Sequence, residues 1–453
     1  MPVVPSSLDR LLFLFRDGFN APTFETFRML VVGFICRIGE HSVCGMLQGA
    51  RLERVWHHSR AHAFFAERKW CPDELGLLLL DFLVATFLAA GAPIRVAVDD
   101  SLFHRAGKQV YGAAWQYDGS VPQGAGRQSG YGNNWVSLCL IVRLPFMRRA
   151  VGLPVLSRLW QPDPDAKQAK AAKRKPNPDY PTKPALARQM LDLVIARFPD
   201  RAIELVGDSA YATKAFAGVP ARVSVTSRLK SNAQLYAPKP PRTGKRGQPA
   251  KKGRRLPKLK AIADDLQTVW EATEVTRSGK RQTVLCHTFE CLWYDVWGQR
   301  QVRVVLVKAT NRSDGYDIAL ITMDTHASPT EIIERYDERW AIEVSYEDAK
   351  QITGVGQARN RVKKAVQRTV PFGFLCQTLT ITWYALYGQA EQDVEHRRQR
   401  SPWYWQKRFP SYQDMLSSLR RAVIAAQYLP VTPRRPIQQQ IARPAPALRA
   451  ASG

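Results

Sequence analysis

The pattern of apolar positions divides the chain into a helical start, a strand-rich middle and a helical end. Through residues 1–92, apolar residues recur at three- and four-residue spacing, as in FETFRMLVVGFICRIG, which indicates packed α-helices. From Pro93 the pattern changes to period two and continuous apolar runs, which predict three successive strands in IRVAVDDS, NWVSLCLIVRLPF and RAVGLPVLSRLW. A helix, ALARQMLDLVIARFP, and a strand, AIELVGDSAYAT, follow. This order predicts an α/β fold with a mixed sheet.

Residues 221–325 have the pattern of a further strand-rich unit. Four apolar stretches predict strands there: RVSVTSRLK, LQTVWEATEVT, RQTVLCHTFECLWYDVWG and RQVRVVLVKAT. They are interrupted by residues 237–260, a segment rich in Pro, Gly and Lys without a single acidic residue. We expect a mobile basic loop that follows a polyanion; the alternative is a linker that touches nothing.

A helix is predicted over residues 334–354, ERYDERWAIEVSYEDAKQITG. Because side chains three, four and seven positions apart share one helix face, it should carry one stripe of a tyrosine, an arginine, a glutamate and a lysine. The stripe consists of Tyr336, Arg339, Glu343 and Lys350. Beyond about residue 391 the chain is rich in Arg, Gln and Pro, and we expect the tail to be disordered.

Two long apolar runs, starting at Gly76 and at Pro371, approach the length of a membrane span. Each contains a polar residue, Asp81 in the first and Gln377 in the second, so we interpret both as buried core helices. The amino-terminal stretch carries acidic residues and arginines where a signal peptide needs an apolar core. We therefore expect an intracellular protein without a membrane partner.

The charge of the chain indicates a polyanionic partner. Its 66 Lys and Arg against 39 Asp and Glu give a net charge of +27. Nucleic acid is the commonest partner of such a protein, since each phosphate neutralised releases condensed counterions. The segment RLERVWHHSRAH, residues 51–62, interleaves bases with aromatic residues and suits docking on phosphates; the alternative is a solvated helix face. A basic enzyme without a polyanionic partner is the alternative for the whole chain.

Metal-binding cysteine motifs are missing from the sequence. The seven cysteines are scattered without a C-x-x-C pair, which argues against a zinc ribbon and against a disulfide framework. The segment CHTFEC, residues 286–291, lies in alternating apolar and polar residues, so we interpret it as a strand.

Four acidic residues stand out by their position. Asp99 and Asp100 end one predicted strand, Asp208 ends another, and Glu343 lies on a helix far downstream. Carboxylates from two neighbouring strands and a packed helix can hold two divalent ions that activate water and stabilise a leaving oxygen. The alternatives are ordinary ones, because aspartates after strands often cap helices and helix glutamates often pair with a nearby base.

The constellation resembles the DDE transposases of bacterial insertion sequences, in particular the group with a Y-x(2)-R-x(3)-E-x(6)-K signature around the third acid. Tyr336, Arg339, Glu343 and Lys350 match that signature without a gap. VAVDDSLFHRAGKQVYG and VGDSAYATKAF are similar to the segments around the family's first two acids, and SVTSRLKSNAQLY is similar to the strand that follows. The first acid is Asp99 if the family pattern D-x-S applies and Asp100 if D-S applies; we favour Asp99.

The resemblance implies a ribonuclease H-like mixed sheet with flanking helices, and a β-rich insertion before the last acid. The implied organisation is a helical, DNA-binding amino-terminal domain, a core in two parts, an insertion, and a basic, partly disordered carboxyl-terminal region. The corresponding residues are 1–92; 93–220 and 326–390; 221–325; and 391–453.

The resemblance also implies a reaction. Asp99, Asp208 and Glu343 would be the catalytic residues and the ligands of two Mg²⁺ ions, for which Mn²⁺ can substitute. The enzyme would cut at transposon ends and join the freed 3′ hydroxyl to target DNA, in a cut-and-paste reaction. Alternatives are a nuclease without strand transfer and a domesticated protein that only binds DNA.

The resemblance further implies how the DNA is held. The partners would be double-stranded terminal inverted repeats, target DNA and a second copy of the chain. Phosphates would meet the signature side chains and further basic residues on the core. These residues are Tyr336, Arg339, Lys350, Arg228, Lys230 and Lys108, with His104 as an additional candidate. A hairpin end would need a flipped base, for which Trp293, Tyr294 and Trp297 are stacking candidates, although a place in the sheet core suits them better.

Overall fold

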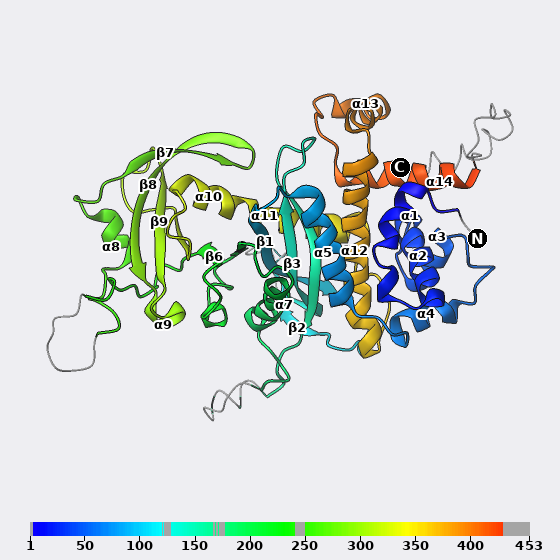
Figure 1. Cartoon of the computed structure of the whole chain (residues 1–453), viewed down its shortest axis with the longest axis horizontal. Helices are drawn as coiled ribbons and strands as arrows, with labels where there is room; N and C mark the ends of the chain where they lie inside the picture. The colour runs from blue at the N-terminus through cyan, green and yellow to red at the C-terminus, as the bar shows by residue number, and fades with distance from the viewer. Residues whose placement is uncertain are drawn as a thin grey trace.

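A computed structural model describes residues 3–428 apart from six short gaps, at 120, 122–127, 166–167, 169–170, 172–176 and 241–249. The disorder predicted from about residue 391 is wrong for residues 391–428, most of which form helices packed on the rest of the chain. The remainder of that prediction, from residue 429, and the centre of the basic loop lie outside the described residues. Figure 1 shows a strand-rich part at the left, a sheet flanked by helices in the centre, and a group of helices at the right.

A mixed sheet forms the centre of the molecule, as the sequence predicts. In the described part of the chain, ten strands join in the order β2-β3-β1-β5-β6-β10-β9-β8-β7, and β4 pairs with β3. β1 is antiparallel to β3 and parallel to β5, and β5 is parallel to β6. The strands are β1 (Ile94–His104), β2 (Ala114–Tyr117), β3 (Ser129–Val142), β4 (Val151–Trp160), β5 (Ile203–Gly207), β6 (Val223–Arg228), β7 (Glu271–Arg277), β8 (Lys280–Leu292), β9 (Gln301–Ala309) and β10 (Ile318–Thr322).

The strand-rich segment expected at 221–325 continues the central sheet. β6 pairs with β5 on one side and with β10 on the other, and β9, β8 and β7 extend the sheet from β10. Two short helices belong to this segment, α8 (Leu259–Asp264) and α9 (Tyr294–Trp297). The strand predicted through Gly298 therefore ends at Leu292.

The basic loop is shorter than the sequence suggests. Tyr236 forms β-bridges with Arg255 and Leu292. The Leu256 N–H donates to the Leu235 carbonyl at 2.9 Å, and Leu259 is buried at the start of α8. Residues 255–260 are thus part of the folded structure rather than of a loop.

Helices from both ends of the chain pack together around one long helix, α12 (Figure 1). Apolar faces of these helices form one continuous core with the central sheet. The helices are α1 (Ser6–Phe13), α2 (Ala21–Cys36), α3 (Val43–Gly49), α4 (His58–Ala66), α5 (Pro72–Phe87), α12 (Lys363–Tyr387), α13 (Ala390–Arg400) and α14 (Tyr412–Tyr428). The two long apolar runs become α5 and α12; α12 is largely buried, as predicted, whereas α5 buries one face and leaves the rest partly exposed. Of the helices described, none has the length and apolar character that crossing a membrane requires.

Three further helices border the centre of the sheet: α7 (Lys183–Arg197), α10 (Pro329–Glu338) and α11 (Trp340–Gln351). α7 packs on β3 and β4, and α11 packs on β4 and β1. α10 begins with a capping box, in which Ser328 accepts from the backbone N–H of Glu331 and the Glu331 side chain accepts from that of Ser328. Such reciprocal bonds satisfy the first amides of a helix and fix where it starts.

Candidate active site

Two aspartates meet at the carboxyl ends of neighbouring parallel strands. Val98 of β1 lies opposite Gly207 of β5, so the next residues along the two strands are Asp99 and Asp208. The side chain that any larger residue would add at Gly207 would meet Val98 Cγ1 and Tyr211 Cβ at 2.9 Å. Glycine at this position therefore allows the close approach that brings Asp208 beside β1.

Asp99 is held on three sides. Its Oδ1 accepts from the backbone N–H of Asp100 at 2.8 Å, and its Oδ2 accepts from Arg339 Nη1 at 3.1 Å. The hydroxyl of Tyr346 donates to the Asp99 carbonyl at 2.8 Å. Burial raises the pKa of Asp99 to about 7, against the opposing effect of the Arg339 charge, and Asp100 and Asp208 raise it further. A pKa shifted this far marks Asp99 as a candidate residue of a functional site.

Arg339 joins two of the three candidate acids, Asp99 and Glu343. Its Nη2 forms an ion pair with Glu343 Oε1 at 2.6 Å, while its Nη1 contacts Asp99. The guanidinium also lies 5.6 Å from the centre of the Tyr336 ring. The helix predicted over 334–354 is in fact two helices, because α10 ends at Glu338 and α11 begins at Trp340, with Arg339 at the junction.

Buried ion pairs fasten α10 to the sheet, and with it the start of α11. Arg335, with only 4% of its side chain exposed, pairs with Glu204 of β5 at 2.9 Å and with Asp324 at 3.2 Å. Arg95 of β1 pairs with the same Glu204 and with Glu338. The sequence gives no sign of the pairs with Glu204 or of the Arg95–Glu338 pair, since their members are more than a hundred residues apart and lie on separate elements.

Asp100 points away from Asp99. Its carboxylate accepts from Lys183 Nζ at 2.5 Å and from the Tyr211 hydroxyl at 3.0 Å. Successive side chains of a strand point to opposite faces of the sheet, so Asp99 faces α11 while Asp100 faces the start of α7. Of the two alternatives left open by the sequence, Asp99 is the one beside Arg339 and Glu343.

Lys350, on α11, contacts β1 just beyond the candidate acids. Its Nζ donates to Ser101 Oγ at 2.7 Å and lies 5.0 Å from the centre of the Phe103 ring. Burial lowers the pKa of Lys350, and the charge of Asp118 opposes that effect. Asp118 also contacts His104 Nε2 at 2.7 Å. Asp118 and Tyr346 are two neighbours of the site that the sequence did not suggest.

The other basic candidates are surface residues. Lys108, Arg228 and Lys230 are exposed. The charge of Arg228 lowers the pKa of Tyr336, against the larger effect of burial, so this arginine is near the signature tyrosine.

The tryptophans considered for base stacking belong to the core. Trp293 is 9% exposed and Trp297 is 4% exposed, and their rings pack against each other at 5.1 Å. Trp297 Nε1 donates to the Thr213 carbonyl at 3.1 Å. Neither ring is accessible to a flipped base, whereas Tyr294 is half-buried beside Tyr236.

The acids are of the type that binds a divalent cation, and two of them point toward the same place. Carboxylate oxygens are the ligands that Mg²⁺ prefers. Asp99 and Glu343 already converge on one cationic group, Arg339, and Asp208 is near enough to affect Asp99. Within the described ranges, no three His, Cys, Asp or Glu side chains are arranged to hold a metal ion. The Arg339 guanidinium instead lies between two of the three carboxylates.

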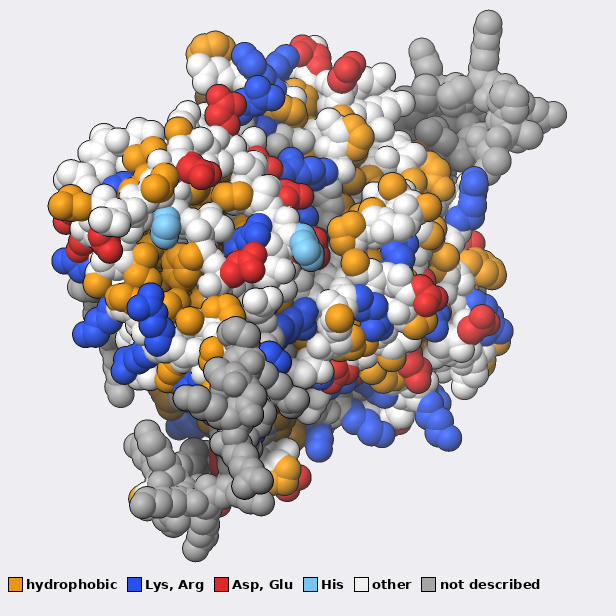
Figure 2. Space-filling model, turned by 60° about the vertical axis from the view of Figure 1, so that its left-hand side comes forward, with side chains coloured by type: hydrophobic (Ala, Val, Ile, Leu, Met, Phe, Trp, Pro, Cys, Tyr) orange, Lys and Arg blue, Asp and Glu red, His pale blue; other side chains and the backbone are white. Residues whose placement is uncertain are grey.

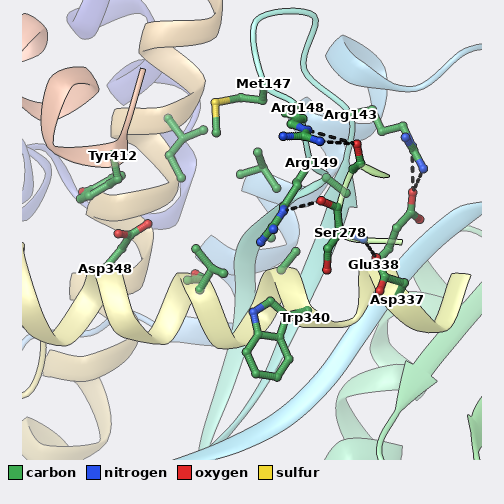
Figure 3. Close-up of a pocket in the computed structure, with 18 of the residues that line it drawn as sticks. Arg143, Met147, Arg148, Arg149, Ser278, Asp337, Glu338, Trp340, Asp348 and Tyr412 are labelled. Atoms are coloured by element: carbon green, nitrogen blue, oxygen red, sulfur yellow. Dashed lines mark hydrogen bonds and ion pairs between the residues drawn. The ribbon is translucent and has the colours of Figure 1, made fainter. Parts of the chain in front are cut away.

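A cavity of about 200 Å³ lies along α11 (Figure 3), and Asp99, Asp208 and Glu343 are not among the residues that line it. Trp340, Val344 and Asp348, four residues apart, line it from α11. Figure 3 shows Asp348 and Tyr412 together at one end and the arginines of the β3–β4 turn at the other. Burial raises the pKa of Asp348 to about 7, and the charge of Glu347 adds to the shift.

Asp348→Asn should stabilise the protein at high pH. Because the folded pKa exceeds the unfolded value of about 3.9, the folded state binds more protons, and stability falls as pH rises from about 4 to about 7. A difference of about three between the folded and unfolded pKa corresponds to at most roughly 4 kcal/mol of unfolding free energy. We expect thermal unfolding to show a higher Tm for the variant at pH 8 and a much smaller difference at pH 5. Glu347→Gln removes only the smaller contribution of the neighbouring charge to the Asp348 pKa, so it should raise the Tm at pH 8 by less. A lower Tm for Asp348→Asn at pH 8 would mean that the carboxylate stabilises the fold.

A comparison with protein families gives a match over much of the chain. A family model described as "DDE superfamily endonuclease" matches residues 14–288, more than half of the chain. The matched segment includes Asp99 and Asp208 and ends before Glu343. A search of curated proteins gave no significant match. The chain belongs to the DDE superfamily endonucleases, enzymes that act on DNA and generally use divalent metal ions.

Proposed function

We propose that the protein is a transposase that cuts DNA at transposon ends and joins those ends to target DNA. The observation that carries this proposal is the meeting of Asp99, Arg339 and Glu343, from β1 and the α10–α11 junction, next to Asp208 at the end of β5. Asp99, Asp208 and Glu343 are the proposed catalytic residues. The Y-x(2)-R-x(3)-E-x(6)-K signature then contributes Glu343 together with its neighbours Tyr336, Arg339 and Lys350.

The strand order supports a ribonuclease H-like core. β4, β3 and β1 are antiparallel neighbours, and β5 and β6 follow in parallel to β1. This arrangement resembles the five-stranded mixed sheet that the signature implies. β7, β8 and β9 lie between Asp208 and Glu343 in the sequence, where the β-rich insertion of such enzymes is expected.

Each residue of the site would have a distinct part in the reaction. Asp99, Asp208 and Glu343 would hold two Mg²⁺ ions, or Mn²⁺ in their place. When bound, such ions supply an activated water and stabilise the leaving oxygen of the phosphodiester. Tyr346 keeps β1 in place through its bond to the Asp99 carbonyl.

The basic residues of the signature would hold the DNA. Arg339 presents a planar fork that suits a phosphate, and Lys350 presents a point charge one strand position beyond the acids. A phosphate that takes the Arg339 guanidinium would release Asp99 and Glu343 for the metal. This exchange couples arrival of the DNA end to assembly of the acids.

The net charge of +27 supports a DNA substrate. Figure 2 shows Lys and Arg side chains spread over one face and along its lower edge. Exposed Lys108, Arg228 and Lys230 could add contacts to the phosphates. Two transposon ends must be held together for joining, so a dimer is part of the proposal.

The alternatives are a nuclease without strand transfer and a protein that only binds DNA. A strand-transfer assay separates them, using the purified chain, Mg²⁺, a labelled duplex carrying the inverted repeat beside the gene, and a supercoiled plasmid. We expect plasmid products covalently joined to the label. Nicked plasmid without joined label would favour the nuclease. Binding without any cut would favour the DNA-binding protein.

The basic loop should contribute to affinity for DNA of any sequence. Replacing residues 239–250 with a Gly-Ser segment of equal length removes four basic residues, Lys239, Arg242, Lys245 and Arg246, and spares the folded residues from 255 onward. The slope of log affinity against log salt should fall by up to roughly 3 to 4. Fluorescence anisotropy at several salt concentrations measures it. The control keeps the four basic residues and replaces only the others; equal slopes for both would show that the loop does not contact DNA.

A further inference from the structure

Three side chains of types that can bind a metal lie on α3 and α4, two amino-terminal helices on the other side of α12 from the central sheet (Figure 1). Cys44 belongs to α3, and His58 and His62 belong to α4. All three side chains are exposed. The two histidines come from the segment RLERVWHHSRAH, whose aromatic and basic residues do not otherwise enter the account of the active site.

The distance between the side chains of Cys44 and His62 matches that between two ligands of one zinc ion. Cys44 Sγ and His62 Nε2 are 3.5 Å apart. Zinc binds thiolate sulfur at about 2.3 Å and imidazole nitrogen at about 2.0–2.1 Å, which in a tetrahedral site separates these two atoms by roughly 3.5 Å. An ion could therefore enter between them without movement of α3 relative to α4.

His58 is placed to supply a third ligand. It precedes His62 by four residues, so both rings project from one face of α4. Their centroids are 6.0 Å apart, whereas two imidazoles on one tetrahedral zinc have centroids roughly 5 Å apart. The described side chains thus do not yet form a three-ligand site. Because the His58 side chain is exposed, rotation about its own bonds can bring it to the ion.

His57 has a different role. Its Nδ1 is 2.8 Å from Ser59 Oγ and accepts from the Ser59 backbone N–H at 3.4 Å, which caps α4. The cap fixes the start of the helix that carries His58 and His62. A water molecule would complete the coordination in place of His57.

We propose that Cys44, His58 and His62 bind a Zn²⁺ ion that links α3 to α4. On binding, the Cys44 thiol loses its proton to solvent, since thiolate is the form that binds metal. Sulfur and nitrogen ligands select zinc, whereas the carboxylates of the candidate active site select Mg²⁺. The ion would stabilise the helical domain without taking part in DNA cleavage.

Cobalt provides a direct test, because Co²⁺ in a zinc site with a thiolate ligand shows a sulfur-to-cobalt charge-transfer band in the near ultraviolet. We expect this band when Co²⁺ is added to the full-length, metal-free protein, and its loss on addition of Zn²⁺. Cys44→Ser and His62→Ala should abolish the band, and His58→Ala should weaken Co²⁺ binding at least about tenfold. Circular dichroism checks that each variant is folded.

Two controls separate this site from others. Cys71→Ser changes another cysteine, directly before α5, and should keep the band. Glu343→Gln changes the candidate active site, whose oxygen ligands cannot give a thiolate band, and should also keep it. No band in the unsubstituted protein, or a band that survives Cys44→Ser, would overturn the proposal.

Discussion

Asp99→Asn, Asp208→Asn and Glu343→Gln should each lower the rate of Mg²⁺-dependent DNA cleavage by on the order of a thousandfold. The reason is that each removes a charged ligand of ions whose stabilisation of the transition state amounts to several kcal/mol. DNA binding should change little, because the substitutions remove negative charge. Cleavage of a labelled end duplex and its binding, measured side by side, check this.

Asp100→Asn is the matched control for the first of these variants. It makes the same chemical change one residue away, on the face of β1 where the carboxylate meets Lys183 and Tyr211. We expect it to keep most of the cleavage activity if the protein remains folded. An inactive Asp100→Asn beside an active Asp99→Asn would reverse the assignment of the first acid.

Arg339→Ala should have two opposite effects. Its guanidinium pairs with both Asp99 and Glu343, so its removal frees these carboxylates, and the Mg²⁺ concentration for half-maximal nicking should fall by up to about tenfold, equivalent to about 1.4 kcal/mol. Loss of the phosphate contact should misplace the DNA end, which can cost about a hundredfold in rate. Nicked intermediates should therefore accumulate while hairpin or joined products decline. A gel time course at several Mg²⁺ concentrations measures both effects.

Lys350→Ala separates the two effects. Lys350 donates to Ser101 and not to the acids, so the variant should accumulate nicked DNA with an unchanged Mg²⁺ requirement. If both variants instead lose every step equally, with no change in Mg²⁺ requirement, then the signature residues serve the fold and Arg339 is a structural partner of Glu343.

Much of the sheet follows from local pattern. Alternating and continuous apolar runs predict β1, β3, β4, β5, β6 and β9 close to where they lie, because a strand needs one or two buried faces. The pattern is less informative after Leu292, where Trp293 and Trp297 pack like strand residues but belong to a helical turn. The sequence did suggest that these tryptophans are buried, because a large apolar side chain is usually buried in a helix as well as in a strand.

The candidate site is predicted only in part. Four fixed residue types select Glu343 and its neighbours, but the sequence cannot decide between Asp99 and Asp100, since both satisfy the same pattern. The choice depends on which face of β1 meets α11. Likewise the break at Arg339 and the pairing of Arg335 with Glu204 depend on contacts between elements far apart in the chain.

Iron-dependent cleavage of the protein itself would test the assignment of the three acids most directly. Fe²⁺ can replace Mg²⁺ at oxygen ligands, and with ascorbate and peroxide it generates radicals that cut the polypeptide next to the bound ion. In the presence of end DNA, we expect cuts close to residues 99, 208 and 343 that excess Mg²⁺ suppresses and that Asp208→Asn removes. Cuts elsewhere, or cuts at these places that persist in Asp208→Asn, would contradict a metal site formed by Asp99, Asp208 and Glu343.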